Sequence, residues 1–295
     1  NFIMQGLGSY PITLGGTPEQ KARYLPPIVR GEAIAAFALT EPHSGSDVVG
    51  MRTTATLEGE EWVLNGSKKF ISQAGDASTY VVFAKTDPAA GSRGLSAFIV
   101  ERGTPGFDDS RRMELMAPHP IGEPRFDNCR LPYTSLIGQP GQGLRLALGT
   151  LDTFRTTVGA AAVGMGQAAY EEALSYARQR TMFGQALSDF QATQFKLADM
   201  AVSLDAARLL TYRAAWLKDS GQESVIKEAS FAKLFATEAA SRIVNEALQI
   251  HGGAGLVKGS RIERLYREVR ALTIYEGTSE IQRQTIARQL LRGQG

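Results

Sequence analysis

The pattern of hydrophobic and polar positions changes twice along the 295-residue chain. Residues 1–34 have a helical pattern, in which Thr17, Pro18 and Gln20 predict a helix start with a capping box and an end near Gly31. Residues 35–137 hold short apolar runs separated by Gly, Pro, Asp and Asn, as strands do. Residues 138–295 return to a helical period. The pattern therefore predicts an α+β fold, with a small antiparallel β domain followed by a C-terminal four-helix bundle.

Individual elements follow from the same pattern. We expect strands at 35–39, 62–64, 80–84 and 95–100, and long helices at 142–180, 191–218, 223–250 and 278–291. Asn65-Gly66 predicts a hairpin turn between 62–64 and 69–71, and 87–94 a flexible hairpin loop. Ser188 predicts a capping-box start for the helix that follows it. The first residues have the pattern of the middle of a helix and no initiator methionine, which favours a fragment.

Composition and charge exclude several classes of protein. The formal net charge is +2 and the basic residues are scattered, so the chain has no electrostatic footprint for nucleic acid. A single cysteine, Cys129, excludes an internal disulfide and a cysteine-based metal cage, and fits a reducing compartment. The three histidines lack the spacing of metal ligands, so we expect no metal site. No apolar run approaches the roughly 20 residues of a membrane span.

Familiar nucleotide-binding and nucleophile motifs are absent from the sequence. Gly164 and Gly166 lie inside the first long helix and favour close helix packing rather than a dinucleotide loop. No GxxxxGK[ST] phosphate loop and no GxSxG elbow occurs.

Two segments of the predicted β domain have side chains suited to a flat, aromatic ligand. In LTEPHSGSD (39–47), hydroxyls flank Gly45, at which a ligand can approach the backbone closely. In KKFISQAGDA (68–77), Phe70 and Ser72 would share one face of a strand. Taken singly, each segment is explained better by an ordinary loop or by strand packing.

Three further segments end or begin helices. RQRTMFGQALSDFQ (178–191) places Arg180 and Phe183 at a helix end, where they suit a pyrophosphate and a base. QIHGGAG (249–255) ends a helix with two glycines. IYEGTSEIQ (274–282) places Glu276 before a helix, where it is either a solvated first-turn carboxylate or a catalytic base. Alone, each is explained by ordinary helix termination or capping.

In combination and in this order, these five segments resemble the acyl-CoA dehydrogenase family of flavoproteins. The resemblance spans nearly the whole chain. Residues 16–32 look like the end of that family's helical first domain, so we expect the chain to lack most of that domain. The resemblance therefore divides the chain into the remnant of an N-terminal helical domain (1–34), a middle β domain (35–137) and a C-terminal helical bundle (138–295).

The resemblance implies positions that bind FAD between the middle and C-terminal domains. The flavin ring would be contacted by Phe37, Leu39, Thr40, Gly45, Ser46, Phe70, Ile71 and Ser72. The pyrophosphate and adenine, in a neighbouring subunit, would be contacted by Arg180, Thr181, Met182, Phe183, Phe190, Gln191, Gln249, Gly252 and Gly253. A last set of FAD contacts would be Thr278, Ser279 and Glu280.

It also implies a substrate site and a reaction. The residues for an acyl-CoA thioester would be Ser46, Asp152, Thr153, Phe154, Arg155, Gly277 and Arg288, of which Asp152 and Arg155 share one helix face. Glu276 would remove the α proton while FAD takes a hydride from the β carbon, which gives the trans-2-enoyl-CoA. Some family members keep the base at the position of Phe154, which cannot accept a proton, and this strengthens the case for Glu276.

The chemistry sets two conditions on this site. The pKa of Glu276 should be raised by an apolar site formed by Tyr275, Ile274 and the acyl chain. The thioester oxygen needs donors, for which the family uses the N–H of the catalytic glutamate and a ribityl hydroxyl, and Gly277 would leave that N–H uncovered.

The implied partners and alternatives complete the prediction. We expect a dehydrogenase of fatty acid metabolism that passes electrons to an electron-transferring flavoprotein, in a homo-oligomer, tetramer or dimer, that shares its FAD sites. The compartment would be the bacterial cytoplasm or the mitochondrial matrix. An acyl-CoA oxidase on the same fold, a non-catalytic flavin- or CoA-binding scaffold, and a mere structured core remain as alternatives.

Overall fold

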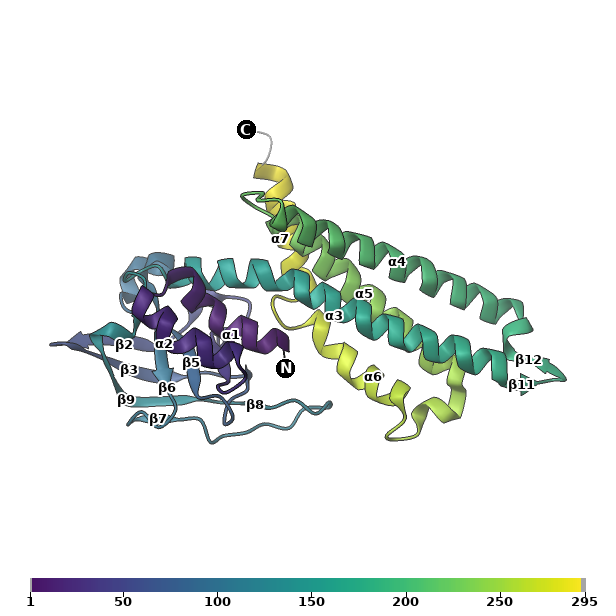
Figure 1. Ribbon diagram of the computed structural model, residues 1–295, viewed down its shortest axis with the longest axis horizontal. Helices are drawn as coiled ribbons and strands as arrows, with labels where there is room; N and C mark the ends of the chain where they lie inside the picture. The colour runs from purple at the N-terminus through teal and green to yellow at the C-terminus, as the bar shows by residue number, and fades with distance from the viewer. Residues whose placement is uncertain (1, 293–295) are drawn as a thin grey trace. The chain divides into compact units, whose positions relative to one another are not determined.

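The computed structural model describes residues 2–292, which fall into two compact units, Asn1–Leu151 and Asp152–Gly295. The first combines two helices with a sheet, and the second is helical (Figure 1). This arrangement confirms the α+β fold class. The division into three domains is a separate matter and stays a prediction.

The first unit begins with two helices, α1 (Phe2–Gly15) and α2 (Pro18–Val29). The predicted capping box is present, because Thr17 Oγ1 accepts from the Gln20 amide at 3.2 Å and Gln20 Oε1 accepts from the Thr17 amide at 3.0 Å. Gln20 Nε2 also donates to the carbonyls of Thr134 and Leu136, at 2.8 and 2.9 Å. One side chain therefore caps α2 and ties it to the edge of the sheet.

The main sheet of this unit has the strand order β10-β6-β5-β2-β3-β9-β7, with β1 paired to β5. Most pairs are antiparallel, whereas β1 and β2 each pair with β5 in parallel. The strands are β1 (Ala35–Ala38), β2 (Thr54–Glu58), β3 (Glu61–Ser67), β5 (Thr79–Lys85), β6 (Leu95–Glu101), β7 (Phe107–Asp108), β9 (Arg125–Pro132) and β10 (Leu136–Ile137). A second, two-stranded sheet pairs β4 (Ile71–Ser72) with β8 (Ile121–Gly122).

Aromatic and branched residues form the core of the β unit. Tyr80, Val82, Phe98 and Val100 are fully buried on the central pair β5 and β6, and Trp62 packs edge-on against Phe98 with ring centroids 5.2 Å apart. The segment 88–94, a 3₁₀ turn, joins these two strands, as predicted for a hairpin connection.

The hairpin turn expected at Asn65-Gly66 is wrong. Strand β3 continues through these residues, and the turn lies at Gly59 and Glu60, because Glu58 pairs with Glu61. Pairing with β9 overrides the local turn signal and leaves a bulge between Leu64 and Gly66. A Cβ on Gly66 would lie 2.6 Å from Thr53 Oγ1, so this glycine allows two chain segments to approach closely.

The prediction that Phe70 and Ser72 share one face of a strand is also wrong, because Phe70 does not belong to the strand. Phe70 lies before β4 and has a left-handed backbone with φ of 57°. The alternation of side chains does not apply across such a residue, so Phe70 and Ser72 are not placed by strand geometry.

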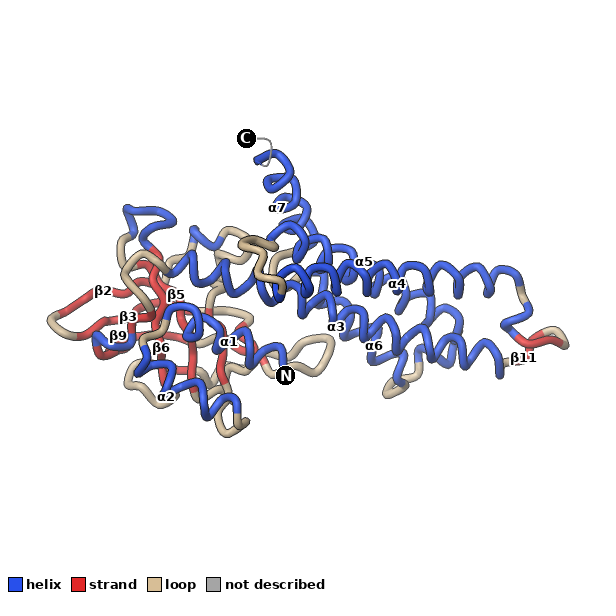
Figure 2. The backbone as a smooth tube through the Cα atoms, turned by 45° about the horizontal axis from the view of Figure 1, so that its top comes forward, coloured by secondary structure: helices blue, strands red, loops and turns tan. Residues whose placement is uncertain are grey.

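The second unit contains the predicted long helices. These are α3 (Gly143–Gln179), which begins in the first unit, α4 (Gln191–Asp219), α5 (Ile226–His251) and α7 (Ser279–Arg292). Figure 2 shows α3, α4 and α5 running beside one another, with the shorter α6 (Arg261–Val269), which the pattern did not predict. Their contact surface is rich in buried alanine, including Ala162, Ala173, Ala236 and Ala240, so the helices pack closely.

The start of α4 is where the pattern placed it, but its cap is not. Phe190 occupies the cap position without a side-chain hydrogen bond, so the expected Ser188 capping box is wrong. Asp189 instead accepts from the amide of Ala186 at 3.2 Å, which shapes the turn before the helix. In the part of the chain that the structure describes, no helix is long and apolar enough to cross a bilayer.

Candidate active site

Glu276 lies on a turn with an unusual backbone. It connects a 3₁₀ turn, Arg270–Thr273, to α7, and its φ is 53°, followed by 90° at Gly277. A left-handed glutamate is uncommon and costs free energy, so surrounding contacts must hold it in place.

The carboxylate of Glu276 is buried without a hydrogen-bond partner. Both Oε atoms are inaccessible, and neither is bonded to any described residue, although the residue as a whole is only half-buried. Burial raises the pKa of Glu276 to about 8, against the opposing positive charges of Arg155 and Lys233. Of its two expected apolar neighbours, Tyr275 packs on the helical core, whereas Ile274 is 54% exposed. A carboxylate with such a proton affinity suits a base at neutral pH.

Asp152 and Arg155 share one face of α3, as expected from their spacing, and form an ion pair of 2.5 Å. Arg155 is only 5% exposed. Its Nε donates to the carbonyl of Glu276 at 3.4 Å, which brings this helix against the turn. Of the other predicted substrate residues of this unit, Gly277 belongs to the same cluster, whereas Arg288 is exposed further along α7.

Two residues of the cluster were missed by the sequence reasoning, Lys233 on α5 and Gln282 on α7. Both are fully buried. Lys233 Nζ donates to the Gly277 carbonyl at 2.8 Å. Gln282 Nε2 donates to the carbonyls of Glu276 and Gly277, at 3.1 and 3.0 Å. The signal available for Lys233 is a lone lysine in the apolar run Ala229 to Ala236, and for Gln282 its closeness to Glu276 in sequence.

The residues expected to bind pyrophosphate and adenine gather at one end of the helical bundle. After α3, strands β11 (Thr181–Met182) and β12 (Gln185–Ala186) form a small hairpin whose tip carries Phe183, 91% exposed. The glycines that follow α5 lie near it, because His251 stacks on Tyr176 with centroids 4.4 Å apart. A Cβ on Gly252 or Gly253 would meet no atom within 4 Å, so the backbone there is open to a ligand. Arg180 and Gln191 are exposed beside the hairpin.

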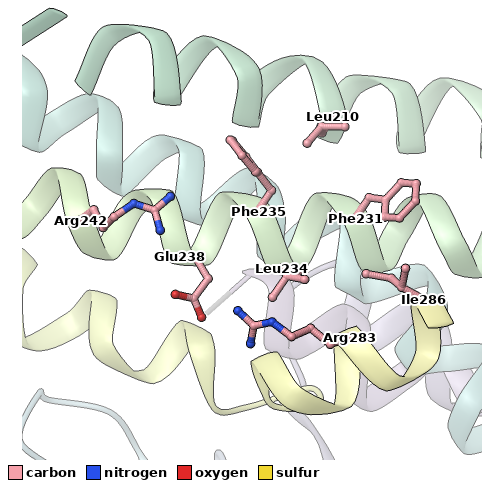
Figure 3. A pocket seen from close by; sticks show the side chains of 8 residues that line it. All are labelled: Leu210, Phe231, Leu234, Phe235, Glu238, Arg242, Arg283 and Ile286. Atoms are coloured by element: carbon pink, nitrogen blue, oxygen red, sulfur yellow. The ribbon is translucent and has the colours of Figure 1, made fainter. Parts of the chain in front are cut away.

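Thr278 and Ser279, which with Glu280 were expected to contact FAD, form hydrogen bonds within the protein. Thr278 Oγ1 accepts from the Ile281 amide at 3.3 Å and so caps α7. Ser279 is 4% exposed and donates to Glu238 at 2.5 Å, whereas Glu280 is exposed. Figure 3 shows the pocket beside this contact, in which Glu238 of α5 and Arg283 of α7 point toward one another. Its lining residues are Leu210, Phe231, Leu234, Phe235, Glu238, Arg242, Arg283 and Ile286.

In the β unit, the residues expected to face the flavin follow two neighbouring segments. The Lys69 amide donates to the Thr40 carbonyl at 2.8 Å, which joins these segments. Gly45, Ser46 and Phe70 are exposed, whereas the remaining members are half-buried or buried, namely Phe37, Leu39, Thr40, Ile71 and Ser72.

Ser72 has a neighbour whose role the sequence left open. His119 Nε2 lies 2.8 Å from Ser72 Oγ, and burial lowers the pKa of His119. His119 therefore contacts a residue that is expected to lie at the flavin.

The exposed groups fit a flavin dinucleotide. Phe70 presents an aromatic side chain on a left-handed backbone, and open backbone occurs at Gly45, Gly252 and Gly253. Arg180 is exposed and carries a positive charge of the kind that a pyrophosphate needs. Within residues 2–292, no group of three or more His, Cys, Asp or Glu side chains could hold a metal ion.

Comparison with known proteins identifies the class to which the chain belongs. Two family models match the chain, the middle domain of acyl-CoA dehydrogenase at residues 36–129 and its C-terminal domain at 141–291. The human mitochondrial short-chain specific acyl-CoA dehydrogenase is 46% identical over 284 residues, which cover 96% of this chain and 69% of that protein. The 3-(aryl)acrylate reductase of Clostridium sporogenes is 47% identical, covering 96% and 75%.

Solved structures agree with these sequences. Butyryl-CoA dehydrogenase from Megasphaera elsdenii superimposes with a TM-score of 0.95 at 40% identity, covering 97% of this chain and 76% of that one. The chain belongs to the acyl-CoA dehydrogenase family. It is an FAD-dependent oxidoreductase that dehydrogenates acyl-CoA thioesters.

Proposed function

We propose that Glu276 is the catalytic base that removes the α proton of an acyl-CoA thioester, with the trans-2-enoyl-CoA as product. The observation that carries this proposal is the buried carboxylate without a hydrogen-bond partner. An α proton next to a thioester is weakly acidic, so a carboxylate of ordinary pKa would be a poor acceptor. The raised pKa of Glu276 brings its proton affinity closer to that of the substrate.

The turn also offers a hydrogen-bond donor that can stabilise negative charge on the thioester oxygen. Arg155, Lys233 and Gln282 donate to the carbonyls of Glu276 and Gly277, which fixes the main chain of the turn. In the proposed reaction the N–H of Glu276 donates to the thioester oxygen. A preorganised N–H stabilises the charge that develops on the thioester oxygen. Since Gly277 has no side chain, it does not obstruct this approach.

FAD, when bound, accepts the hydride equivalent that leaves the β carbon. In the β unit, the residues that would hold its ring include Thr40, Ser46, Phe70 and Ser72. The pyrophosphate and adenine would lie against Arg180 and Phe183, beside Gly252 and Gly253.

We infer that the residues expected to contact the pyrophosphate and adenine bind the FAD of a neighbouring subunit. The helix from Arg155 to Gln179 is about 36 Å long at roughly 1.5 Å per residue, so Arg180 lies far from the Glu276 cluster of its own chain. A symmetric homo-oligomer would bring the end of one bundle to the site of the next. Exposed apolar residues repeat every seven positions along α4, namely Phe195, Val202, Leu209 and Trp216. They form an apolar surface against which a neighbouring subunit could pack.

The relatives suggest a substrate and an acceptor. The human relative is named for short-chain acyl-CoA and the Megasphaera structure for butyryl-CoA, so we propose a short acyl chain. A structure of 42% identity and TM-score 0.95 comes from a study of an electron transferring flavoprotein of Acidaminococcus fermentans, which supports such a protein as acceptor.

Glu276→Gln tests the base. We expect the variant to keep FAD and to bind an acyl-CoA, but to lose flavin bleaching by that acyl-CoA under nitrogen. Glu268→Gln, on the surface of α6, is the matched control and should bleach normally. Retained bleaching in Glu276→Gln would remove Glu276 from this role.

A series of acyl-CoA lengths and branches in the same assay identifies the substrate. Fast reoxidation of the bleached flavin on admission of air would instead favour an oxidase. A colourless protein that takes up no FAD would favour a structured core.

A further inference from the structure

Lys233 is a buried lysine in the helical unit. It is fully buried on α5, in a run that also buries Ala229, Ala232 and Ala236. Burial of an ammonium is costly unless its charge and hydrogen bonds are compensated. Its Nζ donates a hydrogen bond of 2.8 Å to the carbonyl of Gly277. The lysine therefore contacts the main chain of the turn that carries Glu276.

The turn is held from three helices at once. Arg155 on α3 and Gln282 on α7 donate to the Glu276 carbonyl, and Lys233 and Gln282 donate to the Gly277 carbonyl. These bonds fix the two peptide units on either side of Gly277, the second residue of the left-handed pair. They compensate for a conformation that a glutamate adopts at a cost.

Charge is the second property that Lys233 brings to the turn. Glu276 faces two positive groups, Arg155 and Lys233, and each favours its ionised form. Arg155 is itself paired with Asp152 at 2.5 Å, so part of its field is neutralised nearby. The charged groups that act on Lys233 are Glu276, Arg155, Glu238 and Glu280. Burial lowers the pKa of Lys233 to about 8, and the negative charge of Glu276 is the largest effect that acts in the opposite direction.

We propose that Lys233 is a positioning residue for the reaction: its ammonium holds the left-handed turn through the Gly277 carbonyl and supplies a buried positive charge that keeps Glu276 competent as a base. This inference rests on the proposed role of Glu276. It adds a residue that acts through the glutamate and its turn, which Lys233 contacts at the Gly277 carbonyl.

The test measures flavin bleaching by a short acyl-CoA against pH in Lys233→Met and Lys233→Arg. Methionine keeps much of the lysine stem but removes the charge and the donor. We expect Lys233→Met to move the midpoint of the bleaching rate upward by about one pH unit, which is about tenfold slower bleaching near neutral pH. Lys233→Arg, which keeps a positive charge, should shift the midpoint much less.

A readout without turnover accompanies the kinetics. Infrared difference spectra between two pH values report protonated carboxyl groups, and subtraction of Glu276→Gln spectra identifies the band of Glu276. In Lys233→Met this band should persist to a higher pH than in the parent protein. Lys227→Met, which removes a half-buried lysine that pairs with Glu228 on the same helix, is the control and should leave both profiles unchanged.

The possible results separate the two proposals. Loss of bleaching in Glu276→Gln together with an unshifted Lys233→Met profile would overturn the role of Lys233 alone. Retained bleaching in Glu276→Gln would overturn the base itself. Should Lys233→Met fail to fold, Lys233→Gln removes the charge but keeps an amide donor. It should then show the upward shift, and an unchanged midpoint there would count equally against the proposal.

Discussion

The carboxylate of Glu41 lies 2.7 Å from the ammonium of Lys68 inside the β unit, where Lys68 is fully buried and Glu41 is 4% exposed. Lys68 also donates to the Leu39 carbonyl at 3.2 Å. Glu41 accepts from the amides of Arg52 and Thr53, at 2.5 and 3.0 Å. This pair fixes both ends of the loop that carries the proposed flavin contacts, and neither residue was among the predicted site residues.

Removal of one partner should therefore be severe. Lys68→Met leaves Glu41 buried without its counter-charge, and we expect a loss of about 3–5 kcal/mol in the free energy of unfolding, measured in urea. The control is Arg23→Met, which breaks an exposed pair with Glu101 and should cost less than about 1 kcal/mol. Adding Glu41→Gln to Lys68→Met should restore part of the loss. Similar costs for the two single variants would show that the buried pair has no special role.

The raised pKa of Glu276 predicts a pH dependence with a definite sign. Its folded pKa is about 8, against 4.5 for an ordinary glutamate, so the base form increases as the pH rises through about 8. The rate of flavin bleaching should rise about tenfold per pH unit below that midpoint and level off above it. A flat profile between pH 6 and about 9 would contradict a rate set by Glu276.

The same shift affects stability. Between pH 4.5 and about 8 the folded state binds the proton of Glu276 more tightly than the unfolded state does. The stability that this carboxyl contributes is full below 4.5 and is lost as the pH rises through the folded pKa. Glu276→Gln lacks this loss, so its melting temperature relative to the parent should increase between about pH 5 and 8.

The long helices could be predicted because their apolar period extends over many turns, and single residues change it little. The turn at Asn65 and Gly66 could not, because its local signal competes with pairing between β3 and β9, strands far apart in sequence. The same limit applies to Phe70, whose left-handed backbone interrupts a stretch that otherwise has the pattern of a strand.

The site shows a similar division between local and distant information. Glu276 lies in a short motif and could be predicted, by resemblance, from the residues around it. Lys233 donates to a carbonyl 44 positions away, and only the packing of α5 beside α7 brings the two together. In sequence it is a lysine on a helix, a type that is usually solvated. Its contact with the turn therefore depends on tertiary structure.

Gly277 should be intolerant of a side chain for two separable reasons. Its φ is 90°, and a Cβ would lie 2.7 Å from Gln282 Nε2. Gly277→Ala should therefore cost more than about 1 kcal/mol of stability and displace the Gln282 amide from the turn. Gly259→Ala is a close control, because its φ is also 90° but no atom lies within 4 Å of the added carbon. Flavin bleaching should fall far more in Gly277→Ala than in Gly259→Ala, and equal losses would assign the effect to backbone strain alone.

The proposal that one subunit serves the cofactor of another predicts complementation between two inactive variants. Glu276→Gln removes the base but keeps Arg180, whereas Arg180→Ala keeps the base but weakens the pyrophosphate contact. In a mixed pair of subunits, the site with an intact Glu276 receives an intact Arg180 from its partner. When equal amounts of the two variants mix at random, about half of the pairs contain one subunit of each variant. Each of these mixed pairs has one complete site out of two, so activity should recover to roughly one quarter of the parent value.

Two controls make this result decisive. The two variants must first be dissociated and reassociated together, because subunits that do not exchange cannot complement one another. The double variant Glu276→Gln/Arg180→Ala, reassociated with the parent protein, should give no more activity than the parent subunits alone provide. Were Arg180 to act within its own chain, every site of the mixed pair would still carry one defect, and reassociation would yield no gain. The distance of about 36 Å along α3 leads us to expect the gain.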